Sequence, residues 1–335
     1  MRYNVLRYML TLKKIILISS ATLALSTSAQ FGVTGASLFI KIIPEFPDPG
    51  AMIAATLISY NTDLSRADII WTLDGKTLAR GEGVREVSFT AAKHGSRNIL
   101  SAKAIAPDGE EFDASVTIRP QTIDFLTEAK SQVPYWYRGA ALPGGGSRVT
   151  VTAMPNFLLG STRISPSSMT YEWRIDRAPA QNISGKGKQT IFIAAPGVGE
   201  IAREISVLVR SSDRTLAKEA SIIIRAFPAE VLFYEQRSGE GPLTQNALRT
   251  KTLGEGEQIE IAAIPFFMNF SAPSDLNFGW TFNGSPAASN SGSPNAFTVN
   301  TLAGSRGQSA SIGVIITNAK NLLERAADLL NVKVQ

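Results

Sequence analysis

Few side chains in this sequence have the chemistry of a catalytic residue. The 335 residues include a single histidine, His94, and no cysteine, which excludes thiolate catalysis, disulfides and cysteine-based metal sites. No Ser and Asp arrangement surrounds His94 in the sequence, and neither G-x-S-x-G nor H-E-x-x-H occurs. We therefore predict that the protein is not an enzyme.

Metal and cofactor sites are not predicted either. His94 lies in a turn-like segment, residues 91–96, and Asp48-Pro-Gly and Asp108-Gly are typical of turns. The sequence has no calcium loop of the D-x-[DN]-x-[DN]-G type. Residues 185–190, GKGKQT, lack the spacing of a phosphate-binding loop and lie between expected strands.

The densest cluster of side chains suited to binding lies in residues 133–143, VPYWYRGAALP. Aromatic rings beside a cation can stack on a sugar or grip a peptide. The alternative is that the segment packs on its own domain or across a domain junction. The matching segment of a later repeat, residues 241–250, lacks aromatic residues, so the fold does not require the cluster. We predict a partner contact at four of its residues: Tyr135, Trp136, Tyr137 and Arg138.

Two segments expected to be loops, residues 155–166 and 265–273, are unusually apolar. Exposed apolar side chains there would indicate a partner or membrane contact. The alternative is that they continue the strand or pack between neighbouring repeats, where they would stiffen the chain. The side chains that we predict as further partner contacts are Phe157, Leu158, Phe266 and Phe267.

Period-2 alternation of apolar and polar residues dominates the sequence after the N-terminal segment. It is clear in residues 85–91, 112–118, 147–153 and 257–263. Such runs recur about every ten residues between Gly, Pro, Asn or Asp-Gly, which is typical of antiparallel sandwiches or barrels. The sequence therefore predicts an all-β fold.

Three repeats are marked by tryptophan. Trp71, Trp173 and Trp280 lie on β-pattern runs and are separated by 102 and 107 residues. A large ring that faces inward fills the space between two sheets ~10 Å apart, so we predict that each Trp lies in a core. A phenylalanine follows each Trp after 18, 19 or 17 residues, and we expect these rings to add core bulk: Phe89, Phe192 and Phe297.

The surroundings of the tryptophans resemble a known family. Residues 69–75 (IIWTLDG), 170–176 (TYEWRID) and 278–284 (FGWTFNG) resemble the central strand of immunoglobulin-like sandwiches in bacterial surface proteins, of which the polycystic-kidney-disease (PKD) type is the most similar. The FGDG that follows the Trp in that type is absent. The resemblance covers nearly all of residues 38–335 and implies sandwiches of six or seven strands.

We expect three tandem immunoglobulin-like (PKD-like) antiparallel β-sandwich domains after an N-terminal signal peptide. Residues 319–331 have high helix propensity, but the repeat register places the closing hairpin there, and we expect strands. Short joins near Pro120 and Pro228 favour a semi-rigid chain. The predicted division is a signal peptide at 1–29, a linker at 30–37, and domains at 38–120, 121–228 and 229–335.

Residues 1–29 have the pattern of a secretory signal. They carry four of the 33 basic residues and no acidic residue, followed by an apolar run and small residues before a predicted cleavage after Ala29. An uncleaved anchor is the alternative, although the apolar run is shorter than the ~20 residues of a span. The rest of the chain has 29 basic and 28 acidic residues, so no basic surface for nucleic acid is indicated. We expect an exported protein that is periplasmic, on the cell surface or extracellular, with no transmembrane span in the mature chain.

These observations favour a non-enzymatic function. The first hypothesis is a structural, adhesive or protein-interaction protein at the bacterial cell surface or in the periplasm, acting through loops and edge strands. The alternatives are a glycan-binding module or an accessory subunit of a pilus or secretion assembly. The expected partner is a protein or a cell-envelope glycan.

Overall fold

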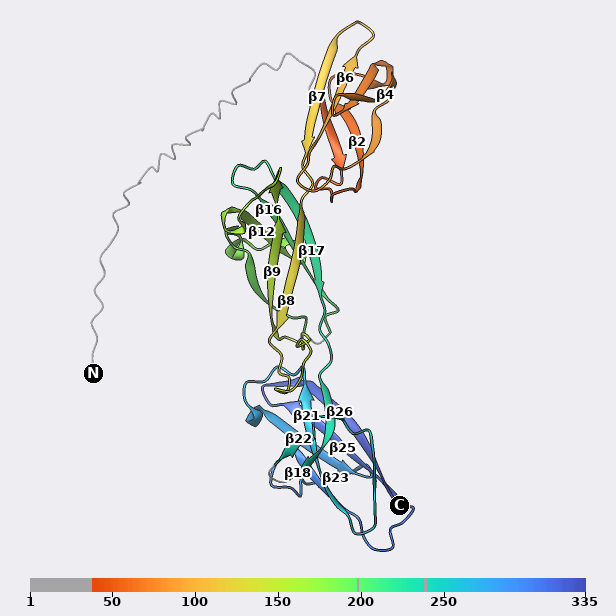
Figure 1. Cartoon of the computed structure of the whole chain (residues 1–335), viewed down its shortest axis with the longest axis vertical. Coiled ribbons are helices and arrows are strands. Elements are labelled where there is room, and N and C mark those ends of the chain that lie inside the picture. The colour runs from red at the N-terminus through yellow and green to blue at the C-terminus, as the bar shows by residue number, and fades with distance from the viewer. Residues whose placement is uncertain (1–37, 198, 238–239) are drawn as a thin grey trace, which may run out of the picture.

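The computed structural model describes residues 38–197, 199–237 and 240–335 (Figure 1). The regular structure in these ranges is β-strand, apart from short 3₁₀ turns at Leu64–Arg66, Pro166–Ser168, Gln181–Ile183 and Pro273–Asp275. The strands form three pairs of sheets, and each pair encloses its own hydrophobic cluster. The predicted all-β, immunoglobulin-like sandwich fold is confirmed. The boundaries of the three predicted domains stay a prediction. No described strand crosses the boundary predicted after residue 120 or the one predicted after residue 228.

The first pair of sheets, here the first unit, has the sheet orders β1-β2-β5 and β4-β3-β6-β7. Its core includes Ile53, Leu57, Ile69, Trp71 and Leu100. Alternate residues of β2 and β6 face this core, as the period-2 pattern requires. The strands are β1 (Leu38–Ile43), β2 (Met52–Ser59), β3 (Asp68–Leu73), β4 (Lys76–Glu82), β5 (Glu86–Thr90), β6 (Asn98–Ile105) and β7 (Glu111–Ile118).

The second unit repeats this plan, with the orders β15-β9-β8 and β13-β12-β16-β17. A two-stranded ribbon, β10-β11, and the short strand β14, which pairs with β12, are additions. The strands are β8 (Thr122–Ala129), β9 (Arg148–Asn156), β10 (Leu158–Leu159), β11 (Thr162–Arg163), β12 (Thr170–Ile175), β13 (Ala178–Pro179), β14 (Gly185–Lys186), β15 (Thr190–Ala194), β16 (Arg203–Arg210) and β17 (Ala217–Ile224).

The third unit has the orders β19-β18-β21-β24 and β20-β26-β25-β22-β23. Residues 319–331, which have high helix propensity, form the turn after β25 and most of β26, so the predicted strands are confirmed. Their pairing with β25 overrides the local preference. The strands are β18 (Glu230–Arg237), β19 (Gly241–Pro242), β20 (Thr250–Leu253), β21 (Gln258–Phe266), β22 (Leu276–Phe282), β23 (Ser285–Ala287), β24 (Ala296–Asn300), β25 (Ser309–Asn318) and β26 (Asn321–Val334).

The three tryptophans lie in the three cores, as predicted. Trp71, Trp173 and Trp280 are 0, 1 and 3 % exposed. The hairpin after each of them turns at an Asp or Asn with positive φ, and the side-chain Oδ1 accepts a hydrogen bond of 2.8–2.9 Å from a backbone N–H of the neighbouring strand. This double role explains why an Asp or Asn follows each Trp: Asp74, Asp176 and Asn283.

The prediction of a core position is wrong for one of the three phenylalanines. Phe89 and Phe297 are buried, but Phe192 is 55 % exposed, and the guanidinium of Arg148 lies 3.9 Å from its ring centroid. Phe192 lies on the outward face of β15, and Ile191 and Ile193 on either side of it face the core instead. A shift of one residue in a strand moves a side chain to the opposite face of the sheet.

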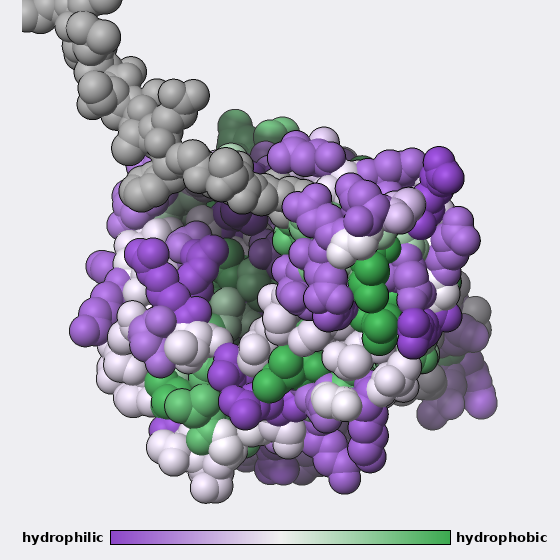
Figure 2. Space-filling model, turned by 90° about the horizontal axis from the view of Figure 1, so that it is seen from above, coloured by the Kyte–Doolittle hydropathy of each residue, from purple (hydrophilic) through white to green (hydrophobic). Residues whose placement is uncertain are grey.

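The units follow one another end to end in an elongated row (Figure 1). Seen along this row from the first unit, hydrophobic residues form separate patches among hydrophilic ones, outside the area that the grey trace covers (Figure 2). The loops at the ends of the sandwiches meet where one unit follows another. The residues at these meeting points include most of the predicted partner contacts.

Candidate partner-contact site

The second and third units meet through residues 130–147, the long segment that joins β8 to β9. The backbone N–H of Gln132 donates to the carbonyl of Met268 at 2.7 Å, and the N–H of Phe267 donates to the carbonyl of Gln132 at 2.7 Å. These reciprocal bonds form an antiparallel bridge between the two units. We call this contact, between residues 130–147 and residues 264–270 with Tyr234, the second joint.

Aromatic rings fill the second joint. Tyr137 packs against Phe266 and Phe267, with ring centroids 5.7 Å apart and near-perpendicular planes in both pairs. Trp136 lies edge-on to Tyr234 of β18 with a centroid distance of 6.1 Å. Edge-to-face pairs contribute about 0.5–1.5 kcal/mol each beyond the burial of their surface. The aromatic cluster that we singled out in the sequence therefore connects two units.

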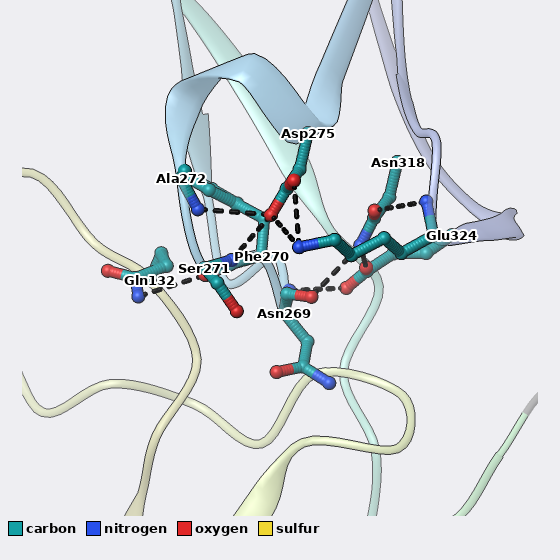
Figure 3. A network of polar contacts seen from close by, with 9 residues as sticks. Gln132, Asn269, Phe270, Ser271, Ala272, Asp275, Asn318 and Glu324 are labelled. Carbon is teal, nitrogen blue, oxygen red and sulfur yellow. Dashed lines mark hydrogen bonds and ion pairs between the residues drawn. The ribbon is translucent and has the colours of Figure 1, made fainter.

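A polar network fixes the third unit's side of the second joint (Figure 3). The buried carboxylate of Glu324 accepts hydrogen bonds from the backbone N–H of Asn269 at 2.6 Å and from Nδ2 of Asn318 at 2.7 Å. Gln132 Nε2 reaches across from the second unit and donates to the carbonyl of Phe270 at 3.1 Å. The hairpin of β25 and β26 thus holds the loop that the second unit contacts.

Two ionisable groups near the second joint have shifted pKa values. A hydrogen bond from Lys320 lowers the pKa of Asp275, and the backbone N–H groups of Ala272 and Ser271 act in the same direction. Burial raises the pKa of Tyr234, although a hydrogen bond with Trp136 opposes the shift. Near neutral pH, Asp275 is therefore a carboxylate and Tyr234 a neutral phenol.

The four residues of the predicted aromatic contact have different environments. Tyr135 is 93 % exposed and Arg138 is also exposed, while Trp136 and Tyr137 are half-buried in the second joint. The ring of Tyr135 stands perpendicular to that of Trp136, with centroids 4.8 Å apart. Tyr135 and Arg138 are the most exposed of the four, so these two side chains are the part that an external partner reaches first.

We predicted that four side chains of the two apolar loops contact a partner. The burial of three of them corrects this prediction. Phe157 is fully buried in the core of the second unit, and Phe266 and Phe267 are buried in the second joint. Leu158 is half-buried, and its backbone N–H and carbonyl are both bonded to the side chain of Gln121. The three phenylalanine side chains are therefore covered by the chain itself and inaccessible to an external partner, whereas the side chain of Leu158 is only partly covered.

The first and second units meet in a similar way, through what we call the first joint. His94 Nε2 donates to the carbonyl of Asn156 at 2.6 Å. On another side, the buried Nζ of Lys218 donates to the carbonyl of Phe46 at 2.9 Å and lies 2.7 Å from a carboxylate oxygen of Asp48. His94 is in a turn, as expected, and that turn contacts the second unit.

Three residues of the joints were missed in the sequence: Lys218, Gln132 and Glu324. Lys218 and Glu324 are buried on strands. Each is an ionisable residue at a strand position that faces inward, and this unusual combination could have identified them. Gln132 gave no signal, because its contacts come from residues far along the chain. Sequence reasoning therefore identified the apolar part of the joints but not the polar part.

The described residues provide little for other chemistry. No group of three or more His, Asp or Glu side chains in residues 38–197, 199–237 and 240–335 could hold a metal ion. In the same part of the chain, no helix is long and apolar enough to cross a membrane. What the geometry offers is a jointed row of sandwiches with an exposed aromatic site at Tyr135.

Comparison with known proteins finds similarity in solved structures only: no family model and no curated protein matches the chain. The three N-terminal domains of the outer capsid protein Hoc of bacteriophage RB49 are 13 % identical, with 90 % of this chain and 100 % of that chain covered and a TM-score of 0.24. The fibronectin(III)-like modules of Clostridium thermocellum CbhA are 16 % identical, with 56 % and 93 % covered and a TM-score of 0.27.

A third similar structure is SGBP-B of the Bacteroides ovatus mixed-linkage glucan utilization locus, in complex with a mixed-linkage heptasaccharide. It is 12 % identical, with 88 % of this chain and 70 % of that chain covered and a TM-score of 0.21. The similar structures include proteins built of tandem immunoglobulin-like or fibronectin(III)-like domains. The TM-scores are low, and the fold assignment therefore rests on the sheets and cores of this chain. The chain is a tandem array of immunoglobulin-like β-sandwiches.

Proposed function

We propose that this chain is an exported, non-enzymatic spacer that holds a contact surface at a fixed distance along a semi-rigid row of sandwiches. The observation that carries the proposal is the second joint, in which Gln132 forms backbone and side-chain hydrogen bonds across the two units beside the Tyr137 ring. Units linked only by a short join are expected to move relative to each other unless a substantial interface holds them. Such an interface is of use to a protein whose function depends on its length.

The first joint supports the same proposal. Lys218 is buried between the units, and its ammonium is bonded to a backbone carbonyl and a carboxylate of the first unit. The ammonium of Lys218 is buried, although Asp48 is exposed, and a buried charge that loses its hydrogen-bond partners is costly, so this contact favours a fixed arrangement of the two units. Both joints therefore restrict bending.

Small-angle X-ray scattering of the purified chain tests the spacer proposal. The expected maximum dimension is that of the extended row, with little conformational averaging. Tyr137→Ala removes the ring between Phe266 and Phe267 and should broaden the distance distribution. Tyr60→Ala, at an exposed tyrosine in the first unit, is the matched control and should leave the distribution unchanged. Compact or widely averaged scattering of the unchanged chain would contradict the proposal.

A second candidate function is glycan binding at Tyr135 and Trp136. The observation that favours it is the nearly complete exposure of Tyr135 beside a perpendicular Trp136 ring, with the exposed Arg138 nearby. Sugar rings stack on such aromatic faces, and a guanidinium donates hydrogen bonds to their hydroxyl groups. Binding to a panel of envelope polysaccharides should be lost in Tyr135→Ala and kept in Tyr60→Ala. If the unchanged chain binds none of the polysaccharides, this candidate fails.

Export is the remaining part of the proposal, and it rests on residues 1–29, which lie outside the described residues. The basic and apolar pattern of this segment supports a secretory signal. Fractionation of cells, with N-terminal sequencing of the protein, tests it. A chain that begins after Ala29 outside the cytoplasm is expected, and a full-length cytoplasmic chain would contradict export.

A further inference from the structure

Tyr135 and Arg138, here called the Tyr135 site, lie on a loop, residues 131–142, that is only weakly attached to its own unit. Among the described residues, this loop contributes no side chain to the hydrophobic core of the second unit. A hydrogen bond from Ser131 Oγ to the carbonyl of Leu142 closes the loop at its base. In the same described part of the chain, no hydrogen bond connects the loop to a strand of the second unit.

The third unit holds this loop instead. Gln132, near the start of the loop, is hydrogen-bonded to the third unit through its backbone and through its side chain. The apolar side chains of the loop pack against aromatic residues of the third unit. The side chains in this contact are Val133, Tyr137 and Leu142 of the loop, and Tyr234, Phe266 and Phe267 of the third unit. The conformation of the loop is therefore set mainly from across the second joint.

The exposed ring of Tyr135 is connected to the third unit through one intermediate ring. Trp136 has two near-perpendicular neighbours, Tyr135 at 4.8 Å and Tyr234 at 6.1 Å between ring centroids. Tyr234 belongs to β18, where it is paired with Ala262 of β21, so its place is set by the sheet of the third unit. Edge-to-face pairs have a preferred geometry. Tyr234 therefore orients Trp136, and Trp136 orients Tyr135.

Separation of the second and third units would remove these supports from the loop. A ligand of the Tyr135 site would then have to order the backbone of the loop as well as the side chains of Tyr135 and Arg138, and this ordering costs conformational entropy. In the docked arrangement the loop is already ordered, because the third unit holds it. The docked arrangement is therefore the one that such a ligand binds more tightly.

We propose that the second joint regulates the Tyr135 site. A glycan binds there with full affinity only while the second and third units are docked, and its binding favours docking in return. This regulation rests on the glycan binding at Tyr135 proposed above. The two effects are equal in size, because the coupling free energy between two binding events is reciprocal. Bending at the second joint therefore weakens glycan binding, and a bound glycan stiffens the row.

Two neighbouring glycines give a matched pair of variants that test this coupling. A Cβ at Gly144 would overlap the carbonyl oxygen of Phe267 in the third unit, whereas a Cβ at Gly145 would meet only ordinary contacts. The probe is the envelope polysaccharide that the unchanged chain binds, titrated by calorimetry. Gly144→Ala should raise its dissociation constant at least about fivefold, and Gly145→Ala should leave it unchanged. Equal dissociation constants for the two variants would overturn the regulation, although glycan binding itself would stand.

Tyr234→Ala tests the same coupling from the side of the third unit. The change removes the ring against which Trp136 packs and leaves Tyr135 and Arg138 in place. The dissociation constant of the polysaccharide should rise about two- to tenfold, which is the range that one edge-to-face pair contributes. Unchanged hydrogen exchange in β25 shows that the third unit is folded. Unchanged affinity in the folded variant overturns the proposal.

The reciprocal effect is measured by hydrogen exchange in residues 264–270, on the third unit's side of the second joint. Saturating polysaccharide should slow this exchange in the unchanged chain, and Tyr135→Ala should abolish the slowing. Slower exchange in residues 133–138 alone would mean that the ligand covers the loop without favouring docking, and this result would overturn the proposal. If the unchanged chain binds no polysaccharide, the glycan candidate and its regulation fail together.

Discussion

The indole Nε1–H of Trp71 donates a hydrogen bond of 2.8 Å to the backbone carbonyl of Val84, in the segment that leads to β5. The same bond recurs from Trp173 to Lys188 at 2.8 Å and from Trp280 to Pro294 at 2.9 Å. Each tryptophan therefore fills its core and also satisfies a carbonyl in the connection between the two sheets. This repeated bond gives a physical reason for Trp, instead of Phe or Leu, at all three positions.

We predict that Trp173→Phe lowers the free energy of unfolding of the second unit by about 2–4 kcal/mol. The change leaves a small cavity and leaves the carbonyl of Lys188 without its donor. Hydrogen-exchange mass spectrometry of peptides from the second unit measures the effect, with peptides from the first unit as the internal reference. A loss below about 0.5 kcal/mol would show that the indole N–H bond is unimportant.

Phe89→Ala and Phe192→Ala should differ strongly in stability, although the two residues occupy matching places in the repeat. Phe89 is buried, and its truncation should cost about 3–5 kcal/mol. Phe192 is exposed and contacts Arg148, so its truncation should cost less than about 1 kcal/mol. Thermal unfolding of both variants checks the prediction, and equal losses would contradict the outward orientation of Phe192.

Gly144→Ala should disturb the second joint, while Gly145→Ala should not. A Cβ at Gly144 would overlap the carbonyl oxygen of Phe267, which is backbone and cannot move aside easily. A Cβ at Gly145 would meet its nearest atom, the carbonyl oxygen of Pro196, at an ordinary 3.8 Å. Faster hydrogen exchange in residues 264–270 of the Gly144→Ala variant alone is the expected result. The same exchange rates in both variants would count against this packing.

The loop at the second joint should lose stability in acid through Asp275. Its pKa is lowered in the folded protein, mainly by the hydrogen bond from Lys320. A lowered pKa means that the stabilisation is complete above the ordinary value of about 3.9 and is lost as the pH falls through the folded value. The protection of residues 269–276 from hydrogen exchange, measured relative to the unfolded chain at the same pH, should therefore fall below about pH 4, and this change should be absent in Asp275→Asn.

An NMR titration of the Asp275 carboxyl gives the control for that prediction. Lys320→Gln removes the largest cause of the shift, so the pKa of Asp275 should rise toward its ordinary value. The backbone N–H groups of Ser271 and Ala272 remain in this variant, and part of the shift should persist. An unchanged pKa in Lys320→Gln would show that Lys320 has no part in the shift.

The sequence by itself determined the class of fold and the repeat. Period-2 alternation and turn residues are local signals, so they were sufficient to predict β-strands and sandwiches, and Trp71, Trp173 and Trp280 were correctly predicted in cores. The register argument also outweighed helix propensity in residues 319–331. The face of the strand on which a residue lies was less secure: the distance from the Trp along the chain did not show that Phe192 points outward, because the intervening turns can absorb a residue.

Only the tertiary structure decided which surfaces are free. Apolar residues in a loop look the same in sequence whether a core, a neighbouring unit or a partner covers them, because burial depends on residues far along the chain. Phe157 is covered by its own core, Phe267 by Tyr137, and Tyr135 by neither.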